Sequence, residues 1–400
     1  MVDSDGALAG VRVLEFTHLV FGPQCGQMLH DLGADVIKVE RPGLGDLSRS
    51  IPISLQDTRP PYFHANNRGK RSIALQLDTP DGIGVARRLV EAADVLLENL
   101  APQAMERLGL GYAACTSINE RLIYASGSTF GSEGPLAARR GADLAGQAFG
   151  GLVAATGPVE QPSPVGVVAA DSTAGLVLCN AILGALLARV RTGRGQRVET
   201  SLYGGATWLG AAELTYALIA DEQYPRFGGG HPSLSPLGLY GVYETADSHL
   251  ALLGAGDKEW TPFLDALELT EIESDPRFLD AKSRVIHAEE LREVVRARLR
   301  ERDTADWATR LAAANVRFAP VQDYRMIAVD EQASVMGYVR RFEGENGASV
   351  QVVGNPIRMS ETPVSPAARA PELGEHTEEV LLEAGYDWAG IEALRESGAI

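Results

Sequence analysis

The sequence predicts an α/β fold built on a parallel sheet, with a second and smaller domain. Over the first 130 residues, short runs rich in β-branched residues and leucine alternate with amphipathic helical patterns, which is typical of βαβ units. The runs are apolar on both faces, as expected for strands that helices cover on each side. The length of 400 residues exceeds what one compact core usually contains, and this predicts the second domain.

Each element of the first 130 residues has a local signal. The expected strands are short and apolar, while the expected helices carry one apolar stripe and end at a residue such as Gly33. In chain order, the sequence predicts a strand at 11–16, a helix at 24–34, strands at 35–40 and 72–78, a helix at 81–93, and strands at 94–99 and 121–128.

Later elements lie on both sides of a stretch rich in Gly, Pro and Ser. The segment 171–193 predicts a long helix that ends at Gly193. The stretch EQYPRFGGGHPSLSPLG (222–238) predicts a loop between domains. After it, the sequence predicts a strand pair at 238–245 and 249–256, helices rich in Glu and Arg from 258 to 313, and a helix at 376–385.

The composition restricts location and partners. A formal net charge of −17 disfavours nucleic acid and anionic membranes, because both need basic patches. The three cysteines are far apart and odd in number, so they predict neither a disulfide framework nor a metal site. The opening MVDSDGALAG lacks the features of a signal peptide, and the apolar stretch ending at Arg189 looks too short to span a bilayer. We expect a soluble cytoplasmic protein without a metal.

Familiar cofactor and hydrolase motifs are missing from the sequence. No stretch completes the glycine spacing of the dinucleotide fingerprint, and GKR at 69–71 lacks the rest of a Walker sequence. The segment GSTFG (127–131) has Thr129 where a nucleophile elbow has serine. These absences argue against NAD-linked redox, ATP-driven and serine-hydrolase chemistry.

A single carboxylate stands out in the apolar stretch PVGVVAADSTAGLVLCNAILGALL (164–187), namely Asp171. One interpretation is that Asp171 only caps the helix that starts there, as aspartate often does. The other is that the apolar walls shelter a nucleophilic carboxylate from water. The residues alone leave both interpretations open.

The chain resembles the class III coenzyme A transferases, the CaiB/BaiF type that includes formyl-CoA transferase and shares its fold with α-methylacyl-CoA racemase. The matching blocks lie in order along nearly the whole chain. Besides the stretch at 164–187, they are residues 10–46, NRGKRSIALQLDTPDG (67–82), ADVLLENLAPQAMERLGLG (93–111), RTGRGQRVETSL (191–202), DPRF (275–278), FAPV (318–321) and LGEHTEEVLLEAGY (373–386).

This resemblance implies a nucleophile at Asp171, which opens a helix before a TGRGQ-like turn. Family enzymes form a mixed anhydride on this carboxylate, release CoA thiolate and then form an enzyme–CoA thioester that passes to the acceptor acid. An enzymic carboxylate suits the exchange because each intermediate keeps its activated bond. We expect the helix start to keep Asp171 ionised, and its backbone amides, with Gly228–Gly230, to surround the developing oxyanion.

The resemblance also implies where CoA, the only cofactor expected, is bound. Arginines suit its phosphates because a guanidinium can bind two phosphate oxygens, whereas apolar residues line the adenine and pantetheine path. The residues at the matching positions are Val20, Phe21, Arg41, Leu75, Leu77, Asn99, Leu100, Arg107 and Arg140.

Two departures from the oxalate/formate branch bear on the substrate. Gly228, Gly229, Gly230 and His231 fall where transferases carry a glycine-rich loop over the thioester, although a plain linker is the alternative. The oxalate/formate enzymes end this glycine run in Gln, and they carry Gln where this chain has Val20. A larger acyl group is therefore favoured, for example succinyl-CoA with a dicarboxylate of four to six carbons.

Two alternative functions follow from the same residues. Racemases of this fold use a His in a G-H-D segment, and here Ala142 stands at that place in GAD (141–143); alanine cannot take up a proton. His231 or His18 could replace it, but neither lies in the matching motif. A CoA-binding protein without turnover is the other alternative, and it would need no nucleophile.

The resemblance finally implies the domain plan and the assembly. We expect a Rossmann-like large domain at 1–200, a linker at 201–227, a small α+β domain at 228–325, and a second linker returning to the large domain at 326–400. Two chains of this family interlock like rings, so we expect a homodimer whose substrates are an acyl-CoA and a small carboxylic acid.

Overall fold

The structure is a computed structural model that describes residues 6–56, 59–158, 160–224, 239–343, 349–364, 367 and 369–400. Its contacts divide the chain into two compact units. The first unit contains Met1–Leu152, Val165–Thr215 and Glu331–Ile400, and the second contains Val153–Pro164 and Tyr216–Asp330. The expected domain boundaries at 200, 228 and 325 stay predictions, and the expected linker at 201–227 contains two helices.

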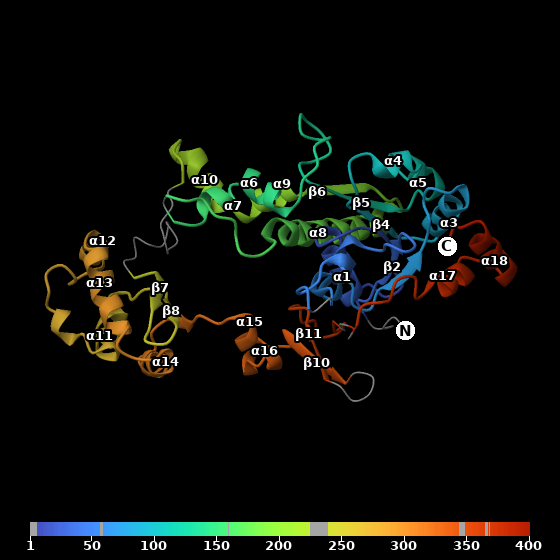
Figure 1. The fold of residues 1–400 in the computed structure, drawn as a ribbon. Helices are drawn as coiled ribbons and strands as arrows, with labels where there is room; N and C mark the ends of the chain where they lie inside the picture. The colour runs from blue at the N-terminus through green and yellow to red at the C-terminus, as the bar shows by residue number, and fades with distance from the viewer. Residues whose placement is uncertain are drawn as a thin grey trace. The chain divides into compact units, whose positions relative to one another are not determined.

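The first unit is built on a six-stranded parallel sheet (Figure 1). Its strands are β1 (Arg12–Phe16), β2 (Asp35–Glu40), β3 (Arg71–Ala74), β4 (Val95–Glu98), β5 (Ile123–Ser128) and β6 (Arg197–Ser201). Their spatial order is β3-β2-β1-β4-β5-β6, the order of a doubly wound dinucleotide-binding sheet. The predicted α/β fold with a parallel sheet is therefore confirmed. The chain order reverses between β1 and β4.

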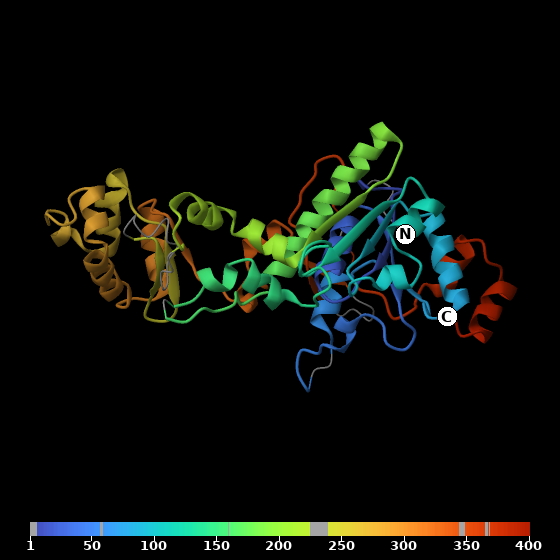
Figure 2. The ribbon, with the colours of Figure 1, turned by 90° about the horizontal axis from the view of Figure 1, so that it is seen from above.

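Helices cover both faces of this sheet, because successive strand residues point to opposite sides. Val13 and Leu14 on β1 belong to different buried clusters. One face packs against α1 (Phe21–Asp31), α8 (Ala169–Thr192) and α9 (Leu202–Leu209). The other packs against α3 (Pro80–Glu91), α5 (Tyr112–Ile118), α17 (Thr377–Glu383) and α18 (Trp388–Glu396). Figure 2 shows the green α8 and the cyan α3 on opposite sides of the strands.

Helix α8 carries the long apolar pattern that the sequence predicted. It spans Ala169–Thr192 and ends at Gly193, whose φ of 71° is left-handed and suits glycine. At 24 residues it is long and apolar enough to cross a membrane, so the expectation that it is too short was wrong. Ala174, Leu178 and Ile182 on this helix are nevertheless fully buried against the sheet, as in a core helix.

Charged side chains fasten α17 to the amino ends of the first strands. Arg71 lies within 3.1 Å of both Glu379 and Glu383, and it also pairs with Asp35. Arg12 joins the same group through Asp35 at 3.1 Å and Glu383 at 2.9 Å. These pairs hold the last part of the chain on the sheet, at the edge opposite the strands' carboxyl ends.

Shorter elements complete the first unit. They are the 3₁₀ turn η1 (Leu47–Ser50), the helices α2 (Pro61–Asn66), α4 (Ala104–Arg107), α6 (Asp143–Phe149) and α16 (Glu331–Val335), and the antiparallel pair β10 (Val339–Glu343) and β11 (Ser349–Val353). Helices α7 (Leu152–Ala155) and α10 (Ala211–Ala220) each run from one unit into the other.

The second unit has its own sheet and core. The predicted strand pair is confirmed as β7 (Gly241–Glu244) and β8 (His249–Leu252), and β9 (Phe318–Pro320) extends it into an antiparallel sheet. The predicted helices are α11 (Asp257–Leu267), α12 (Ala281–Ile286), α13 (Ala288–Leu299) and α14 (Thr304–Ala313), followed by α15 (Tyr324–Ile327). Trp307, Phe263 and Leu250 are among the fully buried residues of its core.

Candidate active site

Two cavities lie at the carboxyl ends of the parallel strands, on either side of the point where the strand order reverses. In doubly wound sheets this is where ligands bind, because the loops leaving β1 and β4 diverge and leave a crevice. We call them the Asp171 cavity and the strand-end pocket. His18 and Leu100 line both, so the two spaces adjoin.

The Asp171 cavity has a volume of about 380 Å³ and brings together six of the residues predicted from the sequence. They are Val20, Phe21, Asn99, Leu100, Arg140 and Asp171. Residues that were not predicted as site residues also line it, including His18, Ala142, the last two residues of β5 (Gly127 and Ser128) and Thr129 after them. Mostly apolar residues therefore surround a single carboxylate, and His18 and Arg140 are the other ionisable groups of the lining.

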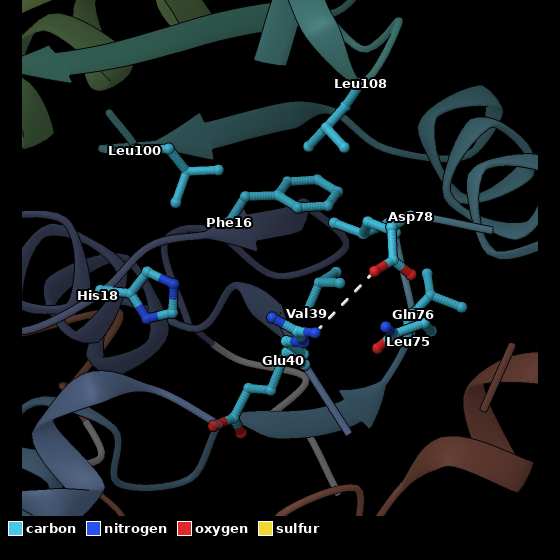
Figure 3. A pocket seen from close by; sticks show the side chains of 11 residues that line it. Phe16, His18, Val39, Glu40, Leu75, Gln76, Asp78, Leu100 and Leu108 are labelled. Atoms are coloured by element: carbon cyan, nitrogen blue, oxygen red, sulfur yellow. Dashed lines mark ion pairs between the residues drawn. The ribbon is translucent and has the colours of Figure 1, made fainter. Parts of the chain in front are cut away.

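The strand-end pocket has a volume of about 230 Å³ and gathers Arg41, Leu75, Leu77 and Leu100, all predicted from the sequence. Figure 3 shows Leu100, Leu108 and the ring of Phe16 together above Val39, with His18 and Asp78 at opposite ends. Arg41 is exposed and lies 3.9 Å from Asp78, the ion pair marked in that figure. The pocket thus offers an apolar slot with a cation at its mouth, which suits a flat ring that carries a phosphate.

The remaining predicted residues are not brought into these cavities. Arg107 is exposed, lines neither cavity and donates a hydrogen bond to the carbonyl of Pro102 at 3.3 Å. Gly228, Gly229, Gly230 and His231 lie outside the described residues. Their expected place over the site stays a prediction.

Asp171 lies in the first turn of α8, but it is not the cap of this helix. The cap position is Val168, and no hydrogen bond from the described residues reaches the Asp171 carboxylate. Burial, and secondly the negative charge of Asp143, raise the pKa of Asp171 to about 7. The interpretation of Asp171 as a simple helix cap was therefore wrong. We expected the helix start to keep Asp171 ionised, but burial and Asp143 outweigh it, because they raise the pKa of this carboxyl above its ordinary value.

Asp143, at the start of α6, takes the place that we expected for an oxyanion. Its Oδ1 accepts hydrogen bonds from the backbone N–H groups of Ala170 at 2.9 Å and Asp171 at 3.1 Å. The N–H groups of Ala169 and Ser172 donate to the carbonyls of Val167 and Val168. The backbone amides at the start of α8 are thus already engaged, which corrects the expectation that they form an oxyanion hole.

The loop after β1 is held in a strained shape beside the Asp171 cavity. Leu19 has a φ of 68°, a left-handed conformation that costs energy for a residue with a Cβ. The Leu19 N–H donates to Asp46 Oδ1 at 3.0 Å. Asn99 donates to the carbonyl of His18 at 3.0 Å and accepts from its N–H at 2.8 Å. These bonds fix the residues that line both cavities.

Buried charges lie beneath this loop. Lys38 is fully buried and lies 2.9 Å from Glu15 and 2.8 Å from Asp46. Lys70 donates to the same Glu15 at 2.8 Å and to the carbonyl of Pro23 at 2.8 Å. The two lysines offset the burial of Glu15 and hold its pKa below the ordinary value. A buried charge without its partner is costly, so this network anchors the loop to the sheet.

Three further residues shape the site without having been predicted as site residues. His18 was weighed only as a replacement base, yet it lines both cavities, and burial lowers the pKa of its ring. Asp143 and Gln147 belong to α6, a short helix that the sequence did not predict. The only signal for Asp143 in the sequence was a charged residue among the small residues of GADLAG (141–146). Nothing in the sequence linked Asp143 to helix α8, which starts 26 residues later.

Known proteins resemble this chain over nearly its whole length. The family model described as CoA-transferase family III matches residues 8–377. The succinate–glutarate CoA-transferase of Agrobacterium fabrum is 35% identical over 383 residues, which cover 94% of this chain and 95% of that protein. The succinyl-CoA:mesaconate CoA-transferase of Haloarcula hispanica is 36% identical over 400 residues, covering 95% and 97%.

A solved structure is also similar to this chain over nearly its whole length. A CAIB/BAIF family protein from Brucella suis superposes with a TM-score of 0.86 at 32% identity, covering 95% of this chain and 100% of that chain.

Proposed function

We propose that this chain, which belongs to CoA-transferase family III, moves CoA from an acyl-CoA donor to a free carboxylic acid through covalent intermediates on Asp171. The protein is a CoA-transferase, as its relatives are. The observation that carries the route is the Asp171 carboxylate itself. It lines a cavity at the sheet's carboxyl edge, and the described residues leave it without a hydrogen-bond donor.

The proposed route replaces one oxygen of the Asp171 carboxylate in each turnover: the attacking oxygen leaves with the donor acid, and the acceptor acid supplies a new one. The ionised Asp171 attacks the thioester carbonyl carbon, the C–S bond breaks, and CoA leaves as a thiolate, giving a mixed anhydride. The thiolate then attacks the Asp171 carbonyl of that anhydride, which releases the donor acid as a carboxylate and leaves CoA bound to Asp171 as a thioester. The acceptor carboxylate attacks this thioester, and the freed thiolate completes the exchange at the acceptor's acyl carbon.

A raised pKa suits this nucleophile. Oxygen nucleophiles become more reactive as their basicity rises, provided that they are ionised at the working pH. With a pKa of about 7, Asp171 is largely ionised at pH 8 and is more basic than an ordinary aspartate. The apolar lining of the cavity restricts water, which would otherwise hydrolyse the anhydride.

We place CoA along the two adjoining cavities. The adenine end occupies the strand-end pocket with its phosphates near Arg41, and the pantetheine arm passes Leu100 and His18 toward Asp171. The shared lining residues support this path, as does the position of Arg140 at the Asp171 cavity. Arg41 is exposed, so phosphate can reach it in place of Asp78.

The acids exchanged are proposed to be short dicarboxylates. Two relatives whose alignments cover at least 94% of this chain are a succinate–glutarate CoA-transferase and a succinyl-CoA:mesaconate CoA-transferase. Val20 lines the Asp171 cavity and offers no amide donor for a small polar acid such as oxalate. We therefore propose succinyl-CoA as donor and a dicarboxylate of four to six carbons as acceptor.

An interlocked homodimer is proposed as the working form. Large apolar side chains of α8 and α9 are exposed in the single chain, with Leu187 at 75%, Val190 at 85% and Trp208 at 72%. Exposed apolar side chains of this size on regular helices support a protein–protein contact. A second copy of the chain would remove them from water.

Mass spectrometry tests the covalent route directly. After incubation with succinyl-CoA alone, we expect a CoA-sized mass increase on the peptide that contains Asp171, and its loss in Asp171→Asn. Asp387→Asn serves as a matched control, because it changes an aspartate that lines neither cavity and leaves the attacking carboxylate in place. Transfer at the parent rate by a folded Asp171→Asn variant would overturn the route.

A second candidate, 2-methylacyl-CoA racemase, rests on the position of His18. Ala142 lines the Asp171 cavity where racemases carry histidine, but His18 lines the same cavity and burial lowers the pKa of its ring. A neutral imidazole and a carboxylate could serve as the two bases. Incubation with a 2-methylacyl-CoA in deuterated water, without acceptor acid, decides this. Rapid α-deuteration that His18→Ala abolishes supports the racemase, and no incorporation excludes it.

A further inference from the structure

We propose that Asp143 is a positioning residue that clamps the start of α8 and whose negative charge drives Asp171 toward its uncharged, covalently modified form. This inference rests on the proposed function, since it assigns a neighbour of the same nucleophile. It concerns a carboxylate that does not itself react.

The clamp consists of hydrogen bonds within the first unit. Asp143 Oδ1 accepts from the N–H groups of Ala170 and Asp171, at 2.9 and 3.1 Å. Its Oδ2 accepts from the side-chain amide of Gln147 at 2.6 Å. Gln147, which is only 2% exposed, also donates to the Val167 carbonyl at 3.2 Å and accepts from the Val165 N–H at 2.9 Å. Asp143 and Gln147 therefore define the path of the chain into α8.

The negative charge of Asp143 should favour the covalent intermediates over the free Asp171 carboxylate. Two carboxylates held this close repel one another when both are ionised. Formation of an anhydride or a thioester on Asp171 removes one of the two charges, and the repulsion disappears with it. Asp143 thus raises the free energy of the free nucleophile relative to both covalent intermediates, while its hydrogen bonds to the α8 backbone keep the nucleophile in place.

Few other charges face Asp171. Among the described residues that line its cavity, the other ionisable groups are His18 and Arg140. Helix α1 contributes Phe21 to the lining, and Leu202, the first residue of α9, also lines it; neither is ionisable. The groups on which the pKa of Asp171 depends are its own burial first and Asp143 second. A neutral side chain at position 143 should therefore have a measurable effect.

The decisive measurement does not require turnover. The pKa of Asp171 is followed by ¹³C NMR in protein labelled at the aspartate carboxyl carbons, with Asp171→Asn identifying the resonance. In Asp143→Asn, whose side-chain oxygen can still accept the two backbone hydrogen bonds, we expect this pKa to fall by about one unit. Asp143→Ser, a second neutral variant with an acceptor oxygen, should shift it in the same direction.

A matched control is available at another helix start. Asp387 caps α18 by accepting a hydrogen bond from the Gly390 N–H at 2.8 Å, and it lines neither cavity. Asp387→Asn should leave the pKa of Asp171 unchanged. An unchanged pKa in folded Asp143→Asn and Asp143→Ser overturns the proposal. Failure of both variants to fold also overturns it, because the role of Asp143 would then be structural.

Activity measurements distinguish this inference from the proposed function. If both hold, the acid limb of the kcat/KM profile moves to lower pH by the same unit in Asp143→Asn. The equilibrium constant for forming the CoA thioester then falls by about tenfold, the equivalent of one pKa unit. A shifted pKa without any CoA adduct in the parent overturns the proposed function alone. Transfer with an unshifted pKa overturns this inference alone.

Discussion

Asn99 and His18 exchange two hydrogen bonds, one in each direction, between the loop after β4 and the loop after β1. The side-chain oxygen of Asn99 accepts from the His18 N–H at 2.8 Å, and its amide nitrogen donates to the His18 carbonyl at 3.0 Å. Since β1 and β4 are the strands between which the order reverses, this exchange holds the crevice at a set width. Both residues line the Asp171 cavity.

Removal of the two hydrogen bonds between Asn99 and His18 should loosen the site. We expect Asn99→Ala to lower the free energy of unfolding by about 1–3 kcal/mol and to raise KM for the acyl-CoA more than it lowers kcat. Asn99→Asp keeps the acceptor for the His18 N–H and should lose less of both. Urea denaturation and steady-state kinetics measure the two effects. Equal losses of stability and of KM in the two variants would show that the hydrogen bonds between Asn99 and His18 do not hold the site.

The raised pKa of Asp171 predicts that its ionised carboxylate lowers the free energy of unfolding. Between pH 4 and 7 the folded protein keeps a proton on Asp171 that the unfolded chain releases, so the free energy of unfolding falls as the pH rises through this window. At pH 8 we expect Asp171→Asn to be more stable than the parent by about 2–4 kcal/mol. At pH 4 the two should be alike. Thermal melts of both proteins across this pH range measure the difference in stability. A parent protein that is more stable than Asp171→Asn at pH 8 would contradict the prediction.

Gly26 on α1 should not tolerate a side chain. A Cβ at this position would lie 2.0 Å from Glu15 Oε2 and 3.0 Å from Lys70 Nζ, inside the buried charge network. We expect Gly26→Ala to destabilise the protein by about 3 kcal/mol or more. Gly84 on α3 is the matched control, because a Cβ there meets nothing within 4 Å. Gly84→Ala should stabilise by about 0.5–1 kcal/mol. Chemical denaturation decides, and similar effects of the two substitutions would refute the prediction.

Arg41 should contribute to CoA binding through charge. We expect Arg41→Ala to weaken CoA binding by about tenfold, the value of a charge-assisted hydrogen bond of roughly 1.5 kcal/mol, and to reduce the dependence of affinity on salt. Arg121→Ala is the control, because Arg121 lies before β5 at the opposite edge of the sheet and is exposed. Calorimetric titration with CoA at two ionic strengths measures both. Equal losses in the two variants would argue against the proposed phosphate contact.

The proposed interlocked dimer has a hydrodynamic signature. Two threaded chains cannot separate while both are folded, so the dimer mass should persist on dilution to nanomolar concentrations. Sedimentation velocity measures this mass. A stable monomer at micromolar concentration would rule the dimer out.

Much of the sheet could be predicted because its signals are local and contiguous. The strand at 35–40 was predicted with the bounds of β2, and the strand at 11–16 differs from β1 by one residue. The strand at 72–78 was predicted too long, because β3 ends at Ala74 and the apolar residues that follow line the strand-end pocket. Apolar residues at a ligand pocket and in a strand give the same pattern.

The site could be predicted only in part. Asp171 stood out because a lone carboxylate in an apolar stretch is conspicuous, and the family blocks indicated its neighbours in the cavity. Its partner Asp143 could not be found, because α6 is seven residues long and no periodicity relates it to α8. For the same reason the backbone amides of α8 were expected to be free. Hydrogen bonds between distant segments are set by the tertiary fold and leave no trace in local sequence.

The two units also imply an order of events during synthesis. The second unit, Val153–Pro164 with Tyr216–Asp330, has its own buried core and leaves the ribosome before α17 and α18 do. The first unit must wait, because Val380, Leu381 and Ile391 complete one of its clusters and the Gln76 N–H donates to the carbonyl of Ala399 at 2.7 Å. Because Gln76 lines the strand-end pocket, we expect this pocket to reach its final form only after translation has passed these helices.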